Sequence, residues 1–351
     1  MFVSFIYGWH KNKPTNFINM KFKSYLTITL SLVSAAFAQA QKADTAQAIV
    51  HYKFSHIRDT TKRDTPYVEN MVLLIGRNAS VYKSYDYKMR QEQMRKSFTE
   101  QMNSGSTNLN FKSVGGLGSP NEFFQFPNDK KFITKDVVGN SYLIEETIPA
   151  MTWNISVDTA NFSGLSCQKA TTHFKGRDYT AWFCPDLPYR AGPWKLNGLP
   201  GLIVEAYDTR KEVVFKFDGL DKVDPKAAAP AAEPAPSMPG RTIVIGDISE
   251  GAKNANLIAL PKNGIKATAK EVNDLRELRR KDPQAFMQMQ MAAMQAQMGG
   301  NTVIRSSATF GGSGSSTGGG LNGVTSVNIQ SSGASAKAAV TNNPLELPEK
   351  K

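Results

Sequence analysis

Short runs of alternating hydrophobic and polar residues dominate residues 41–223, and turn-forming residues separate the runs. Alternation with a period of two places every second side chain on the same face, which is typical of β-strands. Ile49–Phe54 and Phe132–Val137 are two such runs. Gly139-Asn140 and Asp208–Arg210 lie between pairs of runs and predict hairpin turns. The pattern therefore predicts a sheet of mainly antiparallel strands.

A strand with one apolar face is expected near residue 155. Trp153, Ile155 and Val157 alternate with Asn154 and Ser156. Since successive side chains of a strand point to opposite faces, the three apolar side chains should share one face. The segment is therefore predicted to be a one-sided strand.

Helices are predicted in two parts of the chain. Tyr85–Met102 is a polar segment with few apolar residues. A second helix is expected after Thr268, because Thr268 and Glu271 have the spacing of a capping box. Asp282-Pro283 then starts a further helix, with Asp as the N-cap and Pro in the first turn. No regular alternation of strands and helices appears, so we predict a mainly β (α+β) fold rather than a doubly wound one.

The two cysteines flank a predicted hairpin whose turn is Lys175-Gly176. With a two-residue turn, Phe174 faces Arg177, and the numbers of opposed residues add up to 351. The numbers of Cys167 and Cys184 also add up to 351, so these residues should lie opposite each other. Opposed Cβ atoms are about 4.5–5.5 Å apart, within local adjustment of a disulfide. The register predicts a Cys167–Cys184 disulfide, whereas a longer turn would shift the pair to a diagonal.

A glycine- and proline-rich segment follows the hairpin and reads Gly198-Leu199-Pro200-Gly201-Leu202-Ile203. Pro200-Gly201 fits the two central positions of a type II turn, in which Gly201 would supply a positive φ. A phosphate-binding loop would instead need a Lys-Ser/Thr pair or a Gly-x-Gly-x-x-Gly pattern before a helix. The segment Gly198–Ile203 has neither pattern, and a strand follows it, so we expect a turn.

The N-terminal residues have the layout of a secretory signal peptide. Met20 begins a basic start, Leu26–Phe37 is apolar, and Ala36-Phe37-Ala38 is a small-residue cleavage site. The apolar run of about 12 residues is shorter than the roughly 20 needed to span a bilayer. We therefore expect residues 20–40 to be a signal peptide and residues 1–19 to be an extension upstream of the true start. The mature protein would be periplasmic or secreted, soluble, and without a transmembrane segment.

The positive charge of the chain does not indicate nucleic-acid binding. Lys and Arg number 42 and Asp and Glu number 30 among 351 residues, a net charge of +12. Residues 1–40 contain four lysines and no acidic residue, so the remainder carries +8. These charges are scattered, whereas a nucleic-acid surface needs them clustered.

Composition divides the chain after the signal peptide. Residues 41–298 are expected to form a single β-rich domain, interrupted by an extended Pro/Ala-rich linker at residues 225–240 that cannot pair in a sheet. Residues 299–342 are rich in Gly and Ser and are expected to be a flexible tail. Residues 343–351 form a distinct terminal motif.

Several of these segments together resemble the GLPGLI family. Gly198–Ile203 spells its name, and the segments Cys167–Ala170 and Gly192–Lys195 are also similar to it. Asn343–Leu347 resembles the usual ending of the family. Its members are exported proteins of Gram-negative bacteria with no established activity, and their genes often lie near those of TonB-dependent outer-membrane receptors. The resemblance implies an envelope location and a receptor-linked role, and it supplies no catalytic residues.

The expected order of strands is also similar to the open half-barrel of periplasmic lipoprotein carriers. Those carriers hold acyl chains on the concave apolar face of a curved antiparallel sheet. The similarity implies a curved sheet with a few helices, and it suggests an apolar ligand. Function does not follow from a fold alone.

The sequence favours a binding or interaction module over an enzyme, because it contains no H-E-x-x-H or C-x-x-C motif. No cofactor is expected, and the candidate partners are an outer-membrane receptor or envelope protein, or an apolar ligand. An unrecognised hydrolase is kept as an alternative. The candidate face for a ligand or partner consists of aromatic residues that could equally form the core of the sheet: Trp153, Tyr179, Trp182, Phe183 and Trp194.

A methionine-rich segment offers a second alternative, the handling of copper or another soft metal. Thioethers are suitable ligands for Cu(I). Four of the five methionines would share one helical face, which is equally the pattern of ordinary packing. The five residues are Met287, Met289, Met291, Met294 and Met298.

Overall fold

The computed structural model describes residues 43–104, 108–114, 118–223, 237–238, 241–242, 256–297, 326–332 and 341–349. The expected extension at residues 1–19 and the expected signal peptide at residues 20–40 lie outside this part of the chain. So do most of the Pro/Ala-rich linker and most of the Gly/Ser-rich tail.

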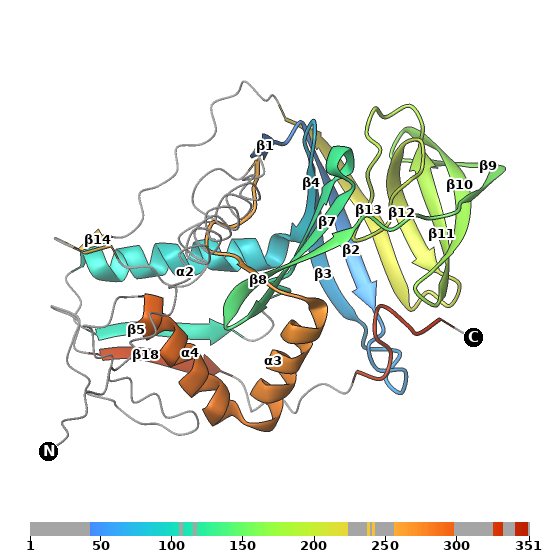
Figure 1. Cartoon of the computed structure of the whole chain (residues 1–351). Helices are drawn as coiled ribbons and strands as arrows, with labels where there is room; N and C mark the ends of the chain where they lie inside the picture. The colour runs from blue at the N-terminus through green and yellow to red at the C-terminus, as the bar shows by residue number, and fades with distance from the viewer. Residues whose placement is uncertain are drawn as a thin grey trace, which may run out of the picture. The chain divides into compact units, whose positions relative to one another are not determined.

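Twelve strands form the main sheet, in the order β17-β8-β7-β6-β4-β3-β2-β13-β12-β11-β10-β9. The strands are β2 (Ala48–His56), β3 (Tyr67–Ile75), β4 (Ser80–Ser84), β6 (Glu122–Phe126), β7 (Lys131–Val138), β8 (Asn140–Thr147), β9 (Asn154–Phe162), β10 (Leu165–Phe174), β11 (Arg177–Cys184), β12 (Leu202–Asp208), β13 (Val213–Lys222) and β17 (Ile265–Lys266). Neighbouring strands are antiparallel except β17 and β8, which are parallel. The sheet curves along this order (Figure 1) and does not close, because β17 and β9 are its edges. The predicted mainly β fold with a curved antiparallel sheet is confirmed.

Three pairs of shorter strands lie outside the main sheet. β1 (Asp44–Thr45) pairs with β16 (Leu257–Ile258), β14 (Ser237–Met238) with β15 (Arg241–Thr242), and β5 (Asn108–Val114) with β18 (Ser326–Ser332). Two of these strands lie in segments for which no strand was expected. β14 lies in the predicted non-pairing linker, at two residues that retain the backbone N–H groups proline lacks. β18 lies in the predicted flexible tail, where Val327 and Ile329 alternate with polar residues as in a strand.

Three helices are found in the described residues: α2 (Tyr85–Asn103), α3 (Ala269–Lys281) and α4 (Pro283–Gln297), besides the single 3₁₀ turn η1 (Pro127–Asp129). The predicted capping box is confirmed, because the Glu271 carboxylate accepts a hydrogen bond of 2.7 Å from the Thr268 N–H. The predicted N-cap of α4 is also confirmed, with Ala285 N donating to Asp282 Oδ1 at 2.9 Å. None of these helices is long and apolar enough to cross a membrane.

Both faces of the sheet carry a hydrophobic core. In β3, Met71, Leu73 and Ile75 pack into the largest cluster of buried residues, while Val72 and Leu74 pack into a second. A strand that is buried on both faces needs a nearly continuous apolar sequence, and β3 has one. A third cluster joins β7 and β8 to α3 and α4 through Val138, Tyr142, Ile144, Val272 and Phe286.

The loop between β11 and β12 covers the first core. Its residues Trp194, Leu196 and Leu199 are at most 2% exposed and belong to the largest cluster. The apolar face of the sheet is thus filled by the chain's own side chains at this point. The same loop contains Gly198–Pro200, so packing of the core fixes the position of this segment.

The predicted one-sided strand at residue 155 differs from the structure. Ile155 is 48% exposed and Val157 is 92% exposed on the edge strand β9. The register between β10 and β9 shifts between Gln168 and Ala170, which leaves Val157 in a bulge. Of the three apolar residues in the predicted pattern, only Trp153, which precedes the strand, packs against the main core.

Candidate functional site

The β10–β11 hairpin has the predicted register. Phe174 pairs with Arg177, and the pairing continues residue by residue to Gln168 and Phe183. Lys175 and Gly176 form the turn with φ values of 50° and 68°, as a two-residue hairpin turn with positive φ at both positions requires. Cys167 and Cys184 form a disulfide, with their Cα atoms 4.1 Å apart. The predicted disulfide is confirmed.

The segment Gly198–Ile203 connects this hairpin to the next strand, β12. Ile203 anchors its end, because its N–H donates to the Ala191 carbonyl at 2.9 Å and its carbonyl accepts from Tyr52 Oη at 2.6 Å. The predicted type II turn is wrong, since Gly198, and not Gly201, has a positive φ, of 91°. Gly201 is needed for space, because a Cβ there would lie 2.4 Å from the Cys184 carbonyl oxygen.

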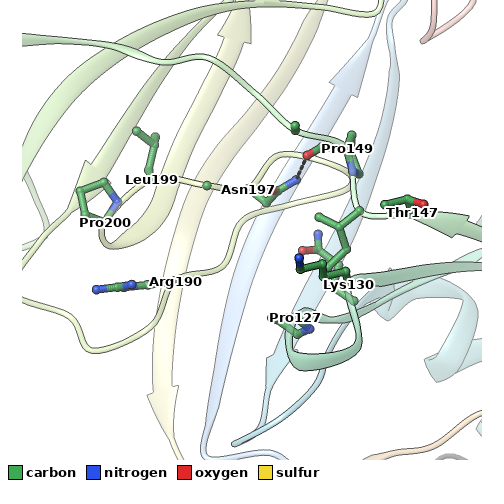
Figure 2. A pocket seen from close by; sticks show the side chains of 12 residues that line it. Pro127, Lys130, Thr147, Pro149, Arg190, Asn197, Leu199 and Pro200 are labelled. Atoms are coloured by element: carbon green, nitrogen blue, oxygen red, sulfur yellow. Dashed lines mark hydrogen bonds between the residues drawn. The ribbon is translucent and has the colours of Figure 1, made fainter.

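A cavity of about 620 Å³ lies beside this segment. It is lined by Gln125, Pro127, Lys130, Thr147, Ile148, Pro149, Ala150, Arg190, Asn197, Gly198, Leu199 and Pro200. Figure 2 shows Arg190, Leu199 and Pro200 on one side, and Pro127, Lys130, Thr147 and Pro149 on the other. One wall therefore comes from the β11–β12 loop, and the other from the turn after β6 and the end of β8.

Hydrogen bonds between side-chain amides and backbone hold the two walls together. Asn197 Nδ2 donates to the Pro149 carbonyl at 3.2 Å, the contact drawn in Figure 2, and to the Lys195 carbonyl at 2.9 Å. Gln125 Nε2 donates to the Trp194 carbonyl at 3.2 Å. The bond from Asn197 to Pro149 and the bond from Gln125 to Trp194 join the β11–β12 loop to the opposite wall, so the cavity has a fixed frame.

The lining of the cavity is positively charged. Lys130 and Arg190 are its charged residues, and no carboxylate belongs to it. Neither forms an ion pair with any residue that the structure describes. Two carboxylates that precede Thr147 are paired with other lysines. Glu145 contacts Lys131 at 2.8 Å, and Glu146 contacts Lys195 at 3.2 Å.

The five predicted aromatic residues do not form one open face. Tyr179, Phe183 and Trp194 are buried in the largest core cluster, and Trp153 and Trp182 are half-buried against it. None of the five lines the cavity. Trp153 contacts a lining residue, because its Nε1 donates a hydrogen bond of 2.8 Å to the Asn197 carbonyl.

The methionine segment gives no metal geometry within the described residues. Met287 is half-buried and Met289 is 36% exposed on α4, whereas the side chains of Met291, Met294 and Met298 lie outside the part that the structure describes. The described residues also contain no group of three or more His, Cys, Asp or Glu side chains that could hold a metal ion.

A buried ionic cluster, which the sequence did not predict, lies at the far end of the same hairpin. Arg177 Nη1 contacts Asp208 at 2.8 Å and Glu212 at 3.4 Å, and all three side chains are buried. Asn343 completes the cluster, donating from Nδ2 to Glu212 at 3.0 Å and to the Ile57 carbonyl at 2.7 Å. The C-terminal motif is therefore docked on the sheet. No local sequence signal indicates this contact.

The comparisons with known proteins cover the candidate site without naming an activity. Residues 75–205, which include every residue that lines the cavity, match the model of a family described as a protein of unknown function (Porph_ging). None of the curated proteins matches the chain. Two solved structures of PNGF-II, in the space groups P21 and C2, are similar to 66% of this chain at 10% identity and a TM-score of 0.42. The chain spans only about a third of their length, 33% and 32%.

Proposed function

We propose that the chain is an exported, non-enzymatic binding module of the bacterial cell envelope, and that it binds its ligand or partner at the cavity beside Gly198–Pro200. The observation that carries this proposal is the frame of the cavity, in which Asn197 ties the glycine-rich segment to the opposite wall. A pre-formed concavity with mostly apolar walls and a few fixed polar groups is typical of small-molecule sites. Its lining has no Ser, Cys, His, Asp or Glu for nucleophilic or acid–base chemistry.

The compartment follows from two independent features. The Cys167–Cys184 disulfide is of the kind that persists in oxidising compartments such as the periplasm. The signal-peptide layout of residues 20–40 agrees with that location. Together with the resemblance to the GLPGLI family, these features support a periplasmic protein that acts with an outer-membrane receptor of the TonB-dependent class.

The structure favours the cavity over the curved sheet face as the site for an apolar ligand. Trp194, Leu196 and Leu199 already fill that face of the sheet. The cavity remains open and offers apolar surface from the half-buried Ile148 together with three prolines. Soft-metal binding and hydrolysis gain no support from the described residues.

Native mass spectrometry of the protein purified from a periplasmic extract tests the proposal. The exposed lining residue Ala150 is replaced by Trp, which fills the cavity without entering the core. Ala292→Trp, on the exposed face of α4, is the matched control. We expect a co-purified ligand or envelope protein with the wild-type chain and with the control, and its loss from Ala150→Trp. Equal retention by all three proteins, or none by any, would contradict the cavity as a binding site.

A further inference from the structure

Resting on the proposed binding function, we infer that the cavity takes an anionic ligand, whose carboxylate or phosphate group is held by Lys130 and Arg190. The two cations come from opposite walls: Lys130 follows η1, and Arg190 precedes the buried part of the β11–β12 loop. Figure 2 shows them on the two sides of the hollow. The Arg190 side chain is drawn pointing away from Lys130, and because both side chains are exposed they can turn towards an anion between the walls.

The charge balance around the cavity supports an anion. Two carboxylates close to Thr147 in sequence, Glu145 and Glu146, are engaged by Lys131 and Lys195, and the exposed Asp129, which precedes Lys130, is not part of the lining. Lys195 also contacts Glu346 at 2.8 Å. Among the residues that the structure describes, Lys131 and Lys195 outside the lining are therefore paired, whereas Lys130 and Arg190 within it are not. Two unpaired cations in a concave site focus positive potential on the space between them.

Both cations extend from fixed backbone. Lys130 has a left-handed backbone with φ of 52°, and its N–H donates to the Pro127 carbonyl at 3.1 Å while its own carbonyl accepts from Ile148 N at 3.0 Å. Arg190 directly precedes Ala191, whose carbonyl accepts from Ile203 N at 2.9 Å. The side chains remain exposed and can close on a ligand. The guanidinium of Arg190 can hold a carboxylate or a phosphate with two parallel hydrogen bonds.

The rest of the lining sets the size and character of the ligand. The volume of about 620 Å³ lies within the range of about 300–1,000 Å³ that small-molecule sites occupy. Ile148 and the three prolines provide apolar contact for the body of the ligand. Thr147 adds a hydroxyl donor. These features fit an organic anion with an apolar body better than a bare inorganic ion.

The test is binding measured by isothermal titration calorimetry on the full mature chain. The probes are octanoate, inorganic phosphate, and vesicles of phosphatidylglycerol compared with vesicles of phosphatidylcholine. The variant Lys130→Asn/Arg190→Gln removes both charges, and Asn tolerates the left-handed backbone at position 130. The control Lys96→Asn/Arg279→Gln removes the same two charges from exposed helical sites outside the lining. Circular dichroism and the intact disulfide confirm that each variant is folded.

We expect at least one anionic probe to bind the wild-type chain, with affinity reduced at least tenfold in Lys130→Asn/Arg190→Gln and unchanged in the control. Binding of octanoate or phosphate in solution identifies a soluble anion, and binding to phosphatidylglycerol vesicles alone identifies a lipid headgroup. No binding of any probe, or equal weakening by the control, overturns the inference. An uncharged ligand that Ala150→Trp displaces would overturn the inference and leave the binding function intact. If Ala150→Trp keeps both ligand and partner, the anion inference and the proposed binding function are both overturned.

Discussion

Arg177 and Asn343 are 166 residues apart in the sequence, yet Arg177 Nη2 donates a hydrogen bond of 2.6 Å to Asn343 Oδ1. The same guanidinium donates to the Pro344 carbonyl at 2.7 Å and to the Leu345 carbonyl at 3.1 Å. Its remaining nitrogen contacts the buried Asp208. One side chain at the tip of the β10–β11 hairpin thus joins the C-terminal motif to the sheet.

Replacing Asn343 by Ala should lower the free energy of unfolding by about 2–4 kcal/mol, because hydrogen bonds to buried charged groups are lost and Arg177 and Glu212 lose a partner. Urea denaturation followed by circular dichroism measures the change. The neighbouring Asn342, which is exposed, is the matched control, and Asn342→Ala should cost no more than about 1 kcal/mol. Equal effects of the two substitutions would show that the C-terminal motif adds little to stability.

His56 should make the protein less stable in mild acid. Its side chain is buried, and burial, together with the nearby charges of Arg177 and Arg58, lowers its pKa from 6.5 to about 4. Below pH 6.5 the unfolded chain therefore binds a proton that the folded chain excludes. The stability contributed by neutral His56 is complete above pH 6.5 and is lost as the pH falls towards 4. The loss approaches about 3 kcal/mol.

Urea denaturation at pH 7.5, 5.5 and 4.5 measures this dependence in the wild type and in His56→Leu. The difference between the two proteins isolates His56, because other titrating groups are common to both. His173 is one such group. Hydrogen bonds to Asp178 and Glu349 raise its pKa, so its contribution is present in acid and is lost as the pH rises. Parallel pH profiles for wild type and His56→Leu would contradict the prediction.

Local sequence patterns predicted the parts of the fold that local geometry controls. The Lys175-Gly176 turn fixed the register of one hairpin, and that register placed Cys167 beside Cys184. Thr268 and Glu271 marked a helix start for the same reason, since a capping box needs only four consecutive residues. In each case the residues that decide the structure are close in sequence.

The candidate site could not be predicted in this way, because its residues meet only through tertiary packing. Lys130 lies between β6 and β7, and Arg190 lies between β11 and β12. No sequence motif relates two positions that are so far apart in the chain. The alternating pattern wrongly predicted that Val157 shares a buried face. Alternation indicates which side chains share a face but not whether other residues cover that face. The aromatic residues were misleading for the opposite reason: Tyr179 and Phe183 have the chemistry of a binding surface but lie in the core.

Removing the disulfide with Cys167→Ala/Cys184→Ala should lower the free energy of unfolding by about 3 kcal/mol, because the bond closes a loop with a sequence separation of 17. Urea denaturation of the variant and of the oxidised wild type gives the difference. The wild type in dithiothreitol should approach the variant, and its intact mass should rise by two hydrogens. A wild type whose stability does not respond to reduction would contradict the prediction.

Replacing either glycine of the Gly198–Ile203 segment by Ala should destabilise the protein, but for a different reason at each position. At Gly201 a Cβ would lie 2.4 Å from the Cys184 carbonyl oxygen and 3.0 Å from Pro185 Cα, both backbone atoms that cannot turn aside. Gly201→Ala should therefore cost about 3 kcal/mol or more by overpacking. At Gly198 the nearest atom is Trp153 Nε1 at 3.6 Å, so the cost is that of the positive φ, about 1–2 kcal/mol.

Asn separates the two causes, because it tolerates positive φ but occupies more space than Ala. In urea denaturation, Gly198→Asn should be more stable than Gly198→Ala, and Gly201→Asn should be no more stable than Gly201→Ala. The same order at both positions would mean that one cause acts at both glycines.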